Sequence, residues 1–239
     1  MNISGFTTAF LVTMATAWWM VTDACMCMPE HPQQKYCKAN FVLKGLIMDN
    51  ANMQDSRWNI TEMVPRSVER DFLTYYVQVE RVFKGENAVI LNSAGITEIK
   101  TPQSASLCGN VELEKGRAYL LSGKVENGTL VIDMCDWVVA YRDMTKKQRQ
   151  SVRFFFKQNC QLCKITPCFS KQHCEQKDSI PNSCTYDMTN LLSGSTDCEG
   201  QHSRCIRSSD GVCRWARSSQ MKECIRHRTQ MAVGRPRWP

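Results

Sequence analysis

The number and spacing of its cysteines constrain this chain more than any other feature. The 239 residues include 14 cysteines. Only two of them lie between Cys37 and Cys160, whereas nine lie between Cys160 and Cys224 when both ends are counted. A region with few cross-links must be held by a hydrophobic core, and a short cysteine-dense region is stapled by disulfides. The spacing therefore predicts two domains that meet near Cys160, at residues 25–160 and 161–239.

Residues 1–24 have the pattern of a signal peptide. The run at 6–21 carries no charge and is mostly apolar, but it is short for a membrane span, which needs about 20 apolar residues. Thr22 and Ala24 are small residues at the positions that signal peptidase reads, so we expect cleavage after Ala24. An uncleaved anchor helix is the alternative. Cleavage predicts a secreted protein without a membrane span.

A dense, even set of cysteines behind a secretion signal indicates disulfides rather than zinc ligands. Cys160 and Cys163 taken alone fit a metal or redox pair, but the other cysteines favour disulfides. The sequons at Asn59 and Asn127 fit a secreted glycoprotein. Neither the histidines nor the acidic residues form a catalytic or metal-ligand pattern, so we expect no enzyme and no cofactor of the protein's own.

The basic residues are concentrated near the end of the chain. The formal net charge is +7. From Arg214 to Pro239, seven Lys or Arg stand against one acid, Glu223. The simpler interpretation is a solvated, frayed tail. The alternative is a handle for an acidic matrix polysaccharide. Nucleic acid is not an expected partner.

Strand patterns dominate the first domain. Apolar or alternating runs predict five strands, at residues 41–48, 72–83, 88–92, 117–123 and 129–134. Asn127 and Gly128 predict a hairpin turn between the last two, because both residues accept positive φ. A helix follows, which Thr145 is placed to cap.

Val152, Phe155 and Phe156 recur on one face of that helix. Five antiparallel strands with a packed helix suit a small closed barrel of the OB type, although periodicity alone does not choose a barrel over a sandwich. The second domain is expected to be stapled by disulfides and mostly β or irregular. The fold class is therefore mainly β.

The most specific motif is CMCMPEHPQ at residues 25–33, directly after the expected cleavage site. Further motif segments follow at 106–109, 119–124, 135–136, 163–166 and 205–213. Taken in order, these segments resemble the tissue inhibitors of metalloproteinases, whose opening pattern is C-x-C-x-P-x-H-P-Q. The resemblance covers nearly the whole mature chain. It implies an N-terminal OB-type (netrin-like) inhibitory domain, a small C-terminal domain, and inhibition of matrix metalloproteinases or related zinc endopeptidases.

The resemblance also implies how most of the cysteines pair. The implied disulfides are Cys25–Cys108, Cys27–Cys135, Cys37–Cys160, Cys163–Cys213, Cys168–Cys174 and Cys184–Cys205. Two further cysteines have no counterpart in the family pattern of twelve. The simplest hypothesis is a Cys198–Cys224 disulfide that ties down the basic tail.

Carried over to Cys25, the family mechanism is chelation of the protease zinc by the free α-amine and the carbonyl oxygen. A catalytic zinc has three protein ligands and one open position, and these two donors close a five-membered ring. Met26 would then enter the specificity pocket, where the family usually has Ser or Thr. An ordinary surface position is the alternative for Met26.

Residues on both sides of Cys25 complete the implied protease-binding surface. Met28 and Pro29 would continue along the cleft, and Ser106 and Leu107 would fill its other side. The full set is Cys25, Met26, Cys27, Met28, Pro29, Ser106, Leu107 and Cys108. A non-inhibitory netrin-like module, which binds matrix or signals, remains the alternative function.

Overall fold

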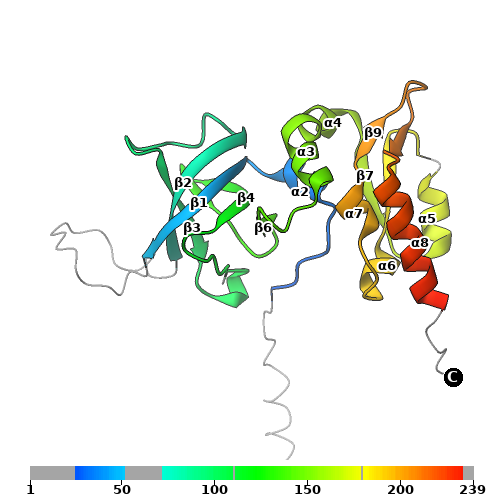
Figure 1. The fold of residues 1–239 in the computed structure, drawn as a ribbon, viewed down its shortest axis with the longest axis horizontal. Coiled ribbons are helices and arrows are strands. Elements are labelled where there is room, and N and C mark those ends of the chain that lie inside the picture. The colour runs from blue at the N-terminus through cyan, green and yellow to red at the C-terminus, as the bar shows by residue number, and fades with distance from the viewer. Residues whose placement is uncertain (1–24, 52–71, 110, 179, 234–239) are drawn as a thin grey trace, which may run out of the picture.

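The computed structural model describes residues 25–51, 72–109, 111–178 and 180–233 (Figure 1). A β-barrel lies at the left of the view and a disulfide-rich C-terminal part at the right, with three helices between them. The expected cleavage site and the sequon at Asn59 lie outside the described residues. Within them, no helix is long and apolar enough to cross a membrane.

Six strands form the barrel sheet. They are β1 (Phe41–Ala51), β2 (Phe72–Lys84), β3 (Ile96–Pro102), β4 (Ala118–Glu126), β5 (Thr129–Val131) and β6 (Val138–Ala140). The order is β1-β2-β3-β5-β4-β6, and β4 also pairs with β1, which closes a five-stranded barrel. Neighbouring strands are antiparallel except β3 and β5, which are parallel. The closed barrel confirms the predicted fold class and excludes the sandwich.

Two clusters of apolar side chains hold this part together. Leu43 and Leu121 are fully buried inside the barrel, whereas their neighbours Val42 and Leu120 are buried in a second cluster on the outer face. Side chains of the three adjoining helices complete the second cluster. β1 and β4 are therefore buried on both faces, which explains why the sequence at 41–48 is a continuous apolar run rather than an alternating one.

The strand predicted at 88–92 is wrong. Ile90 and Leu91 are 76% and 46% exposed, and they lie in a loop that leads into β3. The side-chain oxygen of Asn92 accepts hydrogen bonds from the backbone N–H groups of Ala94 and Ile96, at 3.0 and 2.9 Å. This side chain turns the chain so that β3 begins at Ile96, four residues after the predicted strand ends. The short strand β6 was also not predicted.

The predicted hairpin turn is confirmed between β4 and β5. Asn127 and Gly128 have φ angles of 48° and 80°, which is the backbone conformation that such residues favour in a two-residue hairpin. Asn127 is exposed at the tip. The strand predicted at 129–134 is shorter than expected, because β5 ends at Val131.

Three helices pack against the barrel: α2 (Pro32–Lys38), α3 (Lys146–Phe154) and α4 (Phe156–Leu162). Thr145 caps α3, and its hydroxyl accepts a hydrogen bond from the N–H of Gln148 at 3.1 Å. The predicted single helix is two helices, because Phe155, with φ of −123°, separates α3 from α4. Val152 and Phe156 are buried, as expected, but Phe155 is only half-buried.

The C-terminal part is more helical than predicted. Its elements are β7 (Lys164–Cys168), α5 (Lys171–Asp178), β8 (Ser183–Asp187), α6 (Met188–Leu192), α7 (Cys198–His202), β9 (Cys205–Arg207), β10 (Cys213–Trp215) and α8 (Ser219–Val233). β7 and β8 pair in parallel, and β9 and β10 pair antiparallel. The expectation of a frayed tail is wrong for residues 219–233. They form α8, which buries Met221 and is joined to α7 by the Cys198–Cys224 disulfide.

Seven disulfides join all 14 cysteines, and each pair matches one given above. They are Cys25–Cys108, Cys27–Cys135, Cys37–Cys160, Cys163–Cys213, Cys168–Cys174, Cys184–Cys205 and Cys198–Cys224. Two of them, Cys163–Cys213 and Cys184–Cys205, form the centre of the C-terminal core together with Tyr186.

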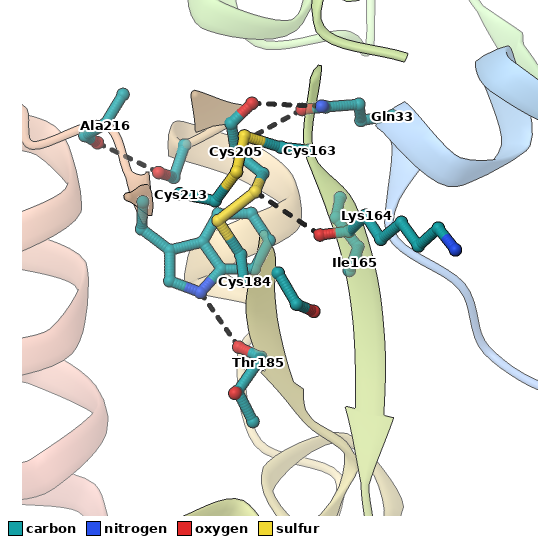
Figure 2. Close-up of a disulfide and its surroundings, with 12 residues drawn as sticks. Gln33, Cys163, Lys164, Ile165, Cys184, Thr185, Cys205, Cys213 and Ala216 are labelled. Atoms are coloured by element: carbon teal, nitrogen blue, oxygen red, sulfur yellow. Dashed lines mark hydrogen bonds between the residues drawn. A yellow bond between two sulfur atoms is a disulfide. The ribbon is translucent and has the colours of Figure 1, made fainter. Parts of the chain in front are cut away.

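The helix α2 links the two parts of the molecule. Figure 2 shows Gln33 of α2 facing Cys205 of β9. The Gln33 amide donates to the Cys205 carbonyl at 3.0 Å and accepts from the Cys205 N–H at 2.9 Å. The next residue, Gln34, donates to the carbonyl of Ile165 at 2.9 Å. The HPQ end of the opening motif therefore binds the backbone of the C-terminal part.

Candidate functional site

The segment 25–30 precedes α2 and has no regular secondary structure. Two disulfides hold it against the barrel edge, Cys25–Cys108 and Cys27–Cys135. The two bonds lie side by side, because the sulfurs of Cys25 and Cys135 are 3.9 Å apart. A segment without backbone pairing is thus fixed at two alternate residues, with Met26 between them.

The loop that receives Cys25 is itself shaped by local hydrogen bonds. The short 3-10 helix η2 (Ala105–Leu107) begins after Ser104, whose hydroxyl accepts from the N–H of Ser106 at 3.3 Å. Cys108 follows in the left-handed conformation, with φ of 58°. Its carbonyl accepts from the N–H of Met134 at 2.8 Å. This bond ties together the two loops that carry Cys108 and Cys135.

Gly109 is required where this loop returns to the barrel. A Cβ at this position would overlap the backbone carbonyl of Pro102 at the end of β3. Only a residue without a side chain allows the Cys108 loop to lie this close to the strand. The glycine in the SLCG motif therefore sets the position of the loop that anchors Cys25.

Exposed apolar side chains surround the anchored segment. Met26 is 84% exposed, Met28 is 51% exposed and Leu107 is 57% exposed. Met134 is 44% exposed. It belongs to the same edge, because its N–H is bonded to the carbonyl of Cys108 and the next residue, Cys135, is bonded to Cys27. Sequence reasoning missed Met134, although its position directly before a predicted half-cystine was a usable signal. Exposed apolar groups gathered at one edge are typical of a protein-binding surface.

A hollow of about 210 Å³ lies beside this segment. Met26 and Met28 form one part of its lining, and the 133–136 turn forms another. The Asp133 carboxylate accepts from the N–H of Cys135 at 2.8 Å and from the N–H of Asp136 at 3.1 Å. These bonds fix the backbone that carries the second anchoring cysteine.

Charged groups in this hollow are partly paired. Lys124 forms an ion pair with Asp133 at 3.0 Å. Burial raises the pKa of Asp136 to about 6, even though the N–H of Asp133 donates to this carboxylate at 2.9 Å and opposes the shift. None of these three residues was predicted at the site. Asp133 and Asp136 flank the predicted half-cystine Cys135, whereas Lys124 comes from β4 and is brought there by the topology of the barrel.

His31 forms the base of the segment and is fully buried. Its Nδ1 accepts from the N–H of Gln33 at 3.0 Å, which caps α2, and its Nε2 lies 3.1 Å from the carbonyl oxygen of Glu199. A carbonyl only accepts hydrogen bonds, so Nε2 carries the proton and the ring is neutral. Burial lowers the pKa of His31 to about 4. His31 is therefore structural, in agreement with the absence of ligand spacing.

The donor atoms that this edge offers to a metal belong to the backbone. In the described part of the chain, the three groups of side chains close enough to share an ion consist of disulfide-bonded cysteines, with Asp187 in one group. A disulfide sulfur is not a thiolate, which is the form that binds zinc. At Cys25 the remaining donors are the nitrogen and the carbonyl oxygen.

Comparison with known sequences decides the family. The sequence model described as tissue inhibitor of metalloproteinase matches residues 23–215. The chain belongs to this family. The match spans the anchored segment, the whole barrel and the C-terminal part as far as β10. The helix α8 lies beyond it.

Curated relatives support the family assignment along most of their length. Metalloproteinase inhibitor 4 of Mus musculus is 29% identical over 201 residues, which cover 82% of this chain and 81% of the relative. Metalloproteinase inhibitor 2 of Bos taurus is 28% identical, with coverage of 82% and 83%. Metalloproteinase inhibitor 3 of Gallus gallus is 26% identical, with coverage of 87% and 90%.

Proposed function

We propose that this protein is a secreted inhibitor of zinc metalloendopeptidases of the matrix metalloproteinase kind. Membership of the family and the names of the relatives support an inhibitory role. The observation that carries the proposal is the double anchoring of Cys25 and Cys27, which leaves the intervening Met26 exposed. Seven disulfides in the mature chain favour the oxidising extracellular space.

In the proposed mechanism, cleavage after Ala24 produces the inhibitory group. It frees the α-amine of Cys25, and this nitrogen and the Cys25 carbonyl oxygen together take the open position on the protease zinc. The protease then has no peptide bond on the N-terminal side of Cys25 to cut. The two disulfides order the segment before binding, so little conformational entropy is lost when the complex forms.

The remaining contacts follow from the exposed apolar edge. Met26, directly after the chelating residue, enters the specificity pocket of the protease. Met28 and Pro29 continue along one side of the cleft, and Ser106 and Leu107 fill the other. We add Met134 to the proposed surface, because its N–H donates to the carbonyl of Cys108 and holds it beside the anchored segment.

A single added residue tests the proposal. The mature protein that begins at Cys25 is compared with a protein that carries one extra alanine before Cys25, in an inhibition assay against a matrix metalloproteinase catalytic domain. We expect loss of inhibition, because the extension turns the amine into an amide, which has no lone pair available for zinc. Equal potency of the two proteins would contradict chelation. Absence of inhibition by both would favour the non-inhibitory module.

We include N-glycosylation of Asn127 in the proposal. Its side chain is exposed at the tip of the β4–β5 hairpin, where a glycan can project into solvent without displacing the core. Treatment of the secreted protein with an N-glycosidase should lower its apparent mass, and Asn127→Gln should remove this glycan. An unchanged glycosylation pattern in Asn127→Gln would contradict occupancy of this sequon.

A further inference from the structure

A basic cleft lies between α3 and the start of α8. Its volume is about 880 Å³. One wall is formed by α3 and by Tyr141, which lies shortly before it in the sequence. The segment 217–220 forms the other wall. The cleft is lined by Tyr141, Lys146, Lys147, Arg149, Gln150, Arg153, Phe154, Arg217, Ser218, Ser219 and Gln220. Five of these residues are cations, and none is acidic.

The cations of the cleft differ from other basic residues of the tail. Arg214 and Arg228 are neutralised within the protein, by Asp210 at 2.6 Å and by Glu199 at 2.9 Å. Among the ion pairs of the described residues, none includes a cation of the cleft. Part of the positive charge at residues 214–239 is thus neutralised by ion pairs within the protein. The cations of the cleft form no ion pair with the described residues and can attract an anionic ligand.

The helix α7 fixes both walls. The hydroxyl of Thr145, which caps α3, donates to the carbonyl of Gln201, and Gln148 donates to the carbonyl of Gly200, at 2.5 and 2.9 Å. On the other wall, Ser218 donates to the carbonyl of His202 at 3.3 Å. Three successive carbonyls of α7 thus hold the two walls, so the cations are positioned before any ligand binds.

One wall belongs to a segment that lies outside the family match. The match ends at residue 215, whereas Arg217 and the start of α8 come after it. α8 is fastened to α7 by the Cys198–Cys224 disulfide, whose two cysteines have no counterpart in the family pattern. The Cys198–Cys224 disulfide and α8, which lies beyond the family match, together hold the second wall of the cleft.

We propose that this cleft binds a sulfated polysaccharide. Arginine guanidinium groups bind tetrahedral oxyanions through paired hydrogen bonds. Gln150, Ser219 and Gln220 can bond sugar hydroxyls, and the exposed ring of Phe154 can pack against a sugar face. Sulfated polysaccharides are polyanions of the extracellular space, which is where a protein with this many disulfides is expected to act. The inference rests on the proposed secretion and is independent of zinc chelation.

A charge-matched pair of variants tests the cleft. The triple variant Arg149→Gln, Arg153→Gln, Arg217→Gln removes three charges from the lining. The control Lys171→Gln, Lys222→Gln, Arg226→Gln removes three charges from α5 and α8 outside the cleft. Binding to heparin, and to hyaluronan as an unsulfated comparison, is measured at about 0.15 M NaCl.

We expect wild type to bind heparin more tightly than hyaluronan. The cleft variant should lose affinity for heparin by roughly tenfold, as expected for three exposed ionic contacts, while the control stays close to wild type. Equal losses in the two triple variants would overturn the proposal, because the attraction would then be diffuse. Equal binding of heparin and hyaluronan, or equal binding of duplex DNA, would also overturn it.

A second substitution set guards against misfolding. Arg149→Lys, Arg153→Lys, Arg217→Lys keeps the net charge and removes only the paired hydrogen bonds of the guanidinium groups. It should lie between wild type and the glutamine variant in affinity for heparin, with an unchanged unfolding midpoint. An affinity for heparin equal to that of wild type in both cleft variants would overturn the proposal. Inhibition of a metalloproteinase should be unchanged in all these variants, which separates this test from that of the proposed function.

Discussion

The barrel and the C-terminal part use disulfides in different ways. In the barrel, aliphatic and aromatic side chains form the core, and the bonds at Cys25 and Cys27 lie at the edge, outside that core. In the C-terminal part, disulfides form a large share of the core, together with Ile165, Tyr186 and Met188. Its central cluster includes four half-cystines that are 0–5% exposed, Cys163, Cys184, Cys205 and Cys213.

This difference separates stability from function. A barrel that is stable through apolar burial can use cross-links to order a functional segment that has no core of its own. A smaller region buries too little apolar surface, so its cross-links must supply stability. Removing disulfides of the two kinds should therefore have different consequences.

The largest effect is expected at the barrel edge. Replacing Cys27 and Cys135 by alanine removes a disulfide with a sequence separation of 108, which can cost up to about 5 kcal/mol of unfolding free energy. Inhibition should weaken on the order of a hundredfold, because a few residues around Met26 must then be ordered on binding. Unfolding curves and inhibition constants measure the two effects.

The control for this variant is the double replacement of Cys37 and Cys160. That disulfide has a similar separation of 123, so its removal should cost similar stability, but it joins α2 to α4 and does not anchor the segment at Cys25. Inhibition should stay within a few-fold of wild type wherever the protein is folded. Equal loss of inhibition in the two variants would remove the distinction between ordering and stability.

A smaller loss of stability, confined to one region, is expected in the C-terminal core. Replacing Cys184 and Cys205 by alanine removes a link with a separation of 21, about 3 kcal/mol from chain entropy. Hydrogen exchange should become fast in β7 and β8 while the barrel stays protected. Replacing Cys198 and Cys224, with a separation of 26, should release only α8. Protection of β7 and β8 in the first variant would show that disulfides are not needed to hold the core.

The junction between the two parts should respond to pH. The pKa of His31 is lowered to about 4 in the folded protein from about 6.5 when unfolded. Between these pH values the unfolded state binds more protons than the folded state. The contribution of His31 to the free energy of unfolding is therefore fully present above about pH 6.5 and is lost as the pH is lowered toward 4. The loss between pH 7 and pH 5 should be about 2 kcal/mol.

His31→Asn isolates this contribution, because asparagine can still cap α2 but does not titrate. Denaturant unfolding of both proteins at several pH values gives the comparison. Asp136, whose pKa is raised to about 6, contributes with the opposite sign in both proteins and cancels in the difference. Parallel pH profiles for the two proteins would contradict the role given to His31.

The smallest effect is expected at Met26. Burying a methionine side chain contributes about 1.5–3 kcal/mol, so Met26→Ala should raise the inhibition constant about tenfold without changing the unfolding midpoint. Met28→Ala is the control, because Met28 is already half-buried and gains less on binding. An unchanged inhibition constant for Met26→Ala would mean that Met26 is ordinary surface.

The same comparison explains how much the sequence could predict. β1, β2 and β4 lie close to their predicted ranges, because local apolar runs and alternation reflect burial in a barrel. The strand was predicted at 88–92 because Ile90 and Leu91 are apolar, but both are exposed in a loop. The true strand, β3, begins at Ile96. The C-terminal elements depend on cross-links between distant residues, which leave no local pattern, so α7 and α8 could not be predicted.

The candidate site was predictable in part. The motif at residues 25–33 and the resemblance indicated the anchored segment and its disulfides. Met134 and the Asp133 turn were missed, although they flank Cys135, because no apolar or charged pattern at residues 133–136 indicated which side chains of the turn face the anchored segment. His31 showed no ligand pattern, and its role as a cap and junction depends on burial by the C-terminal part.

Chelation of the protease zinc by the amine and the carbonyl oxygen of Cys25 can be tested directly. Replacing that zinc by cobalt(II) makes the metal coordination visible in the absorption spectrum. Addition of the protein that begins at Cys25 should change the ligand-field bands, because nitrogen and oxygen donors replace water, and the protein with one extra alanine should leave them unchanged. An unchanged spectrum with the mature protein, under conditions in which it inhibits, would contradict chelation by Cys25.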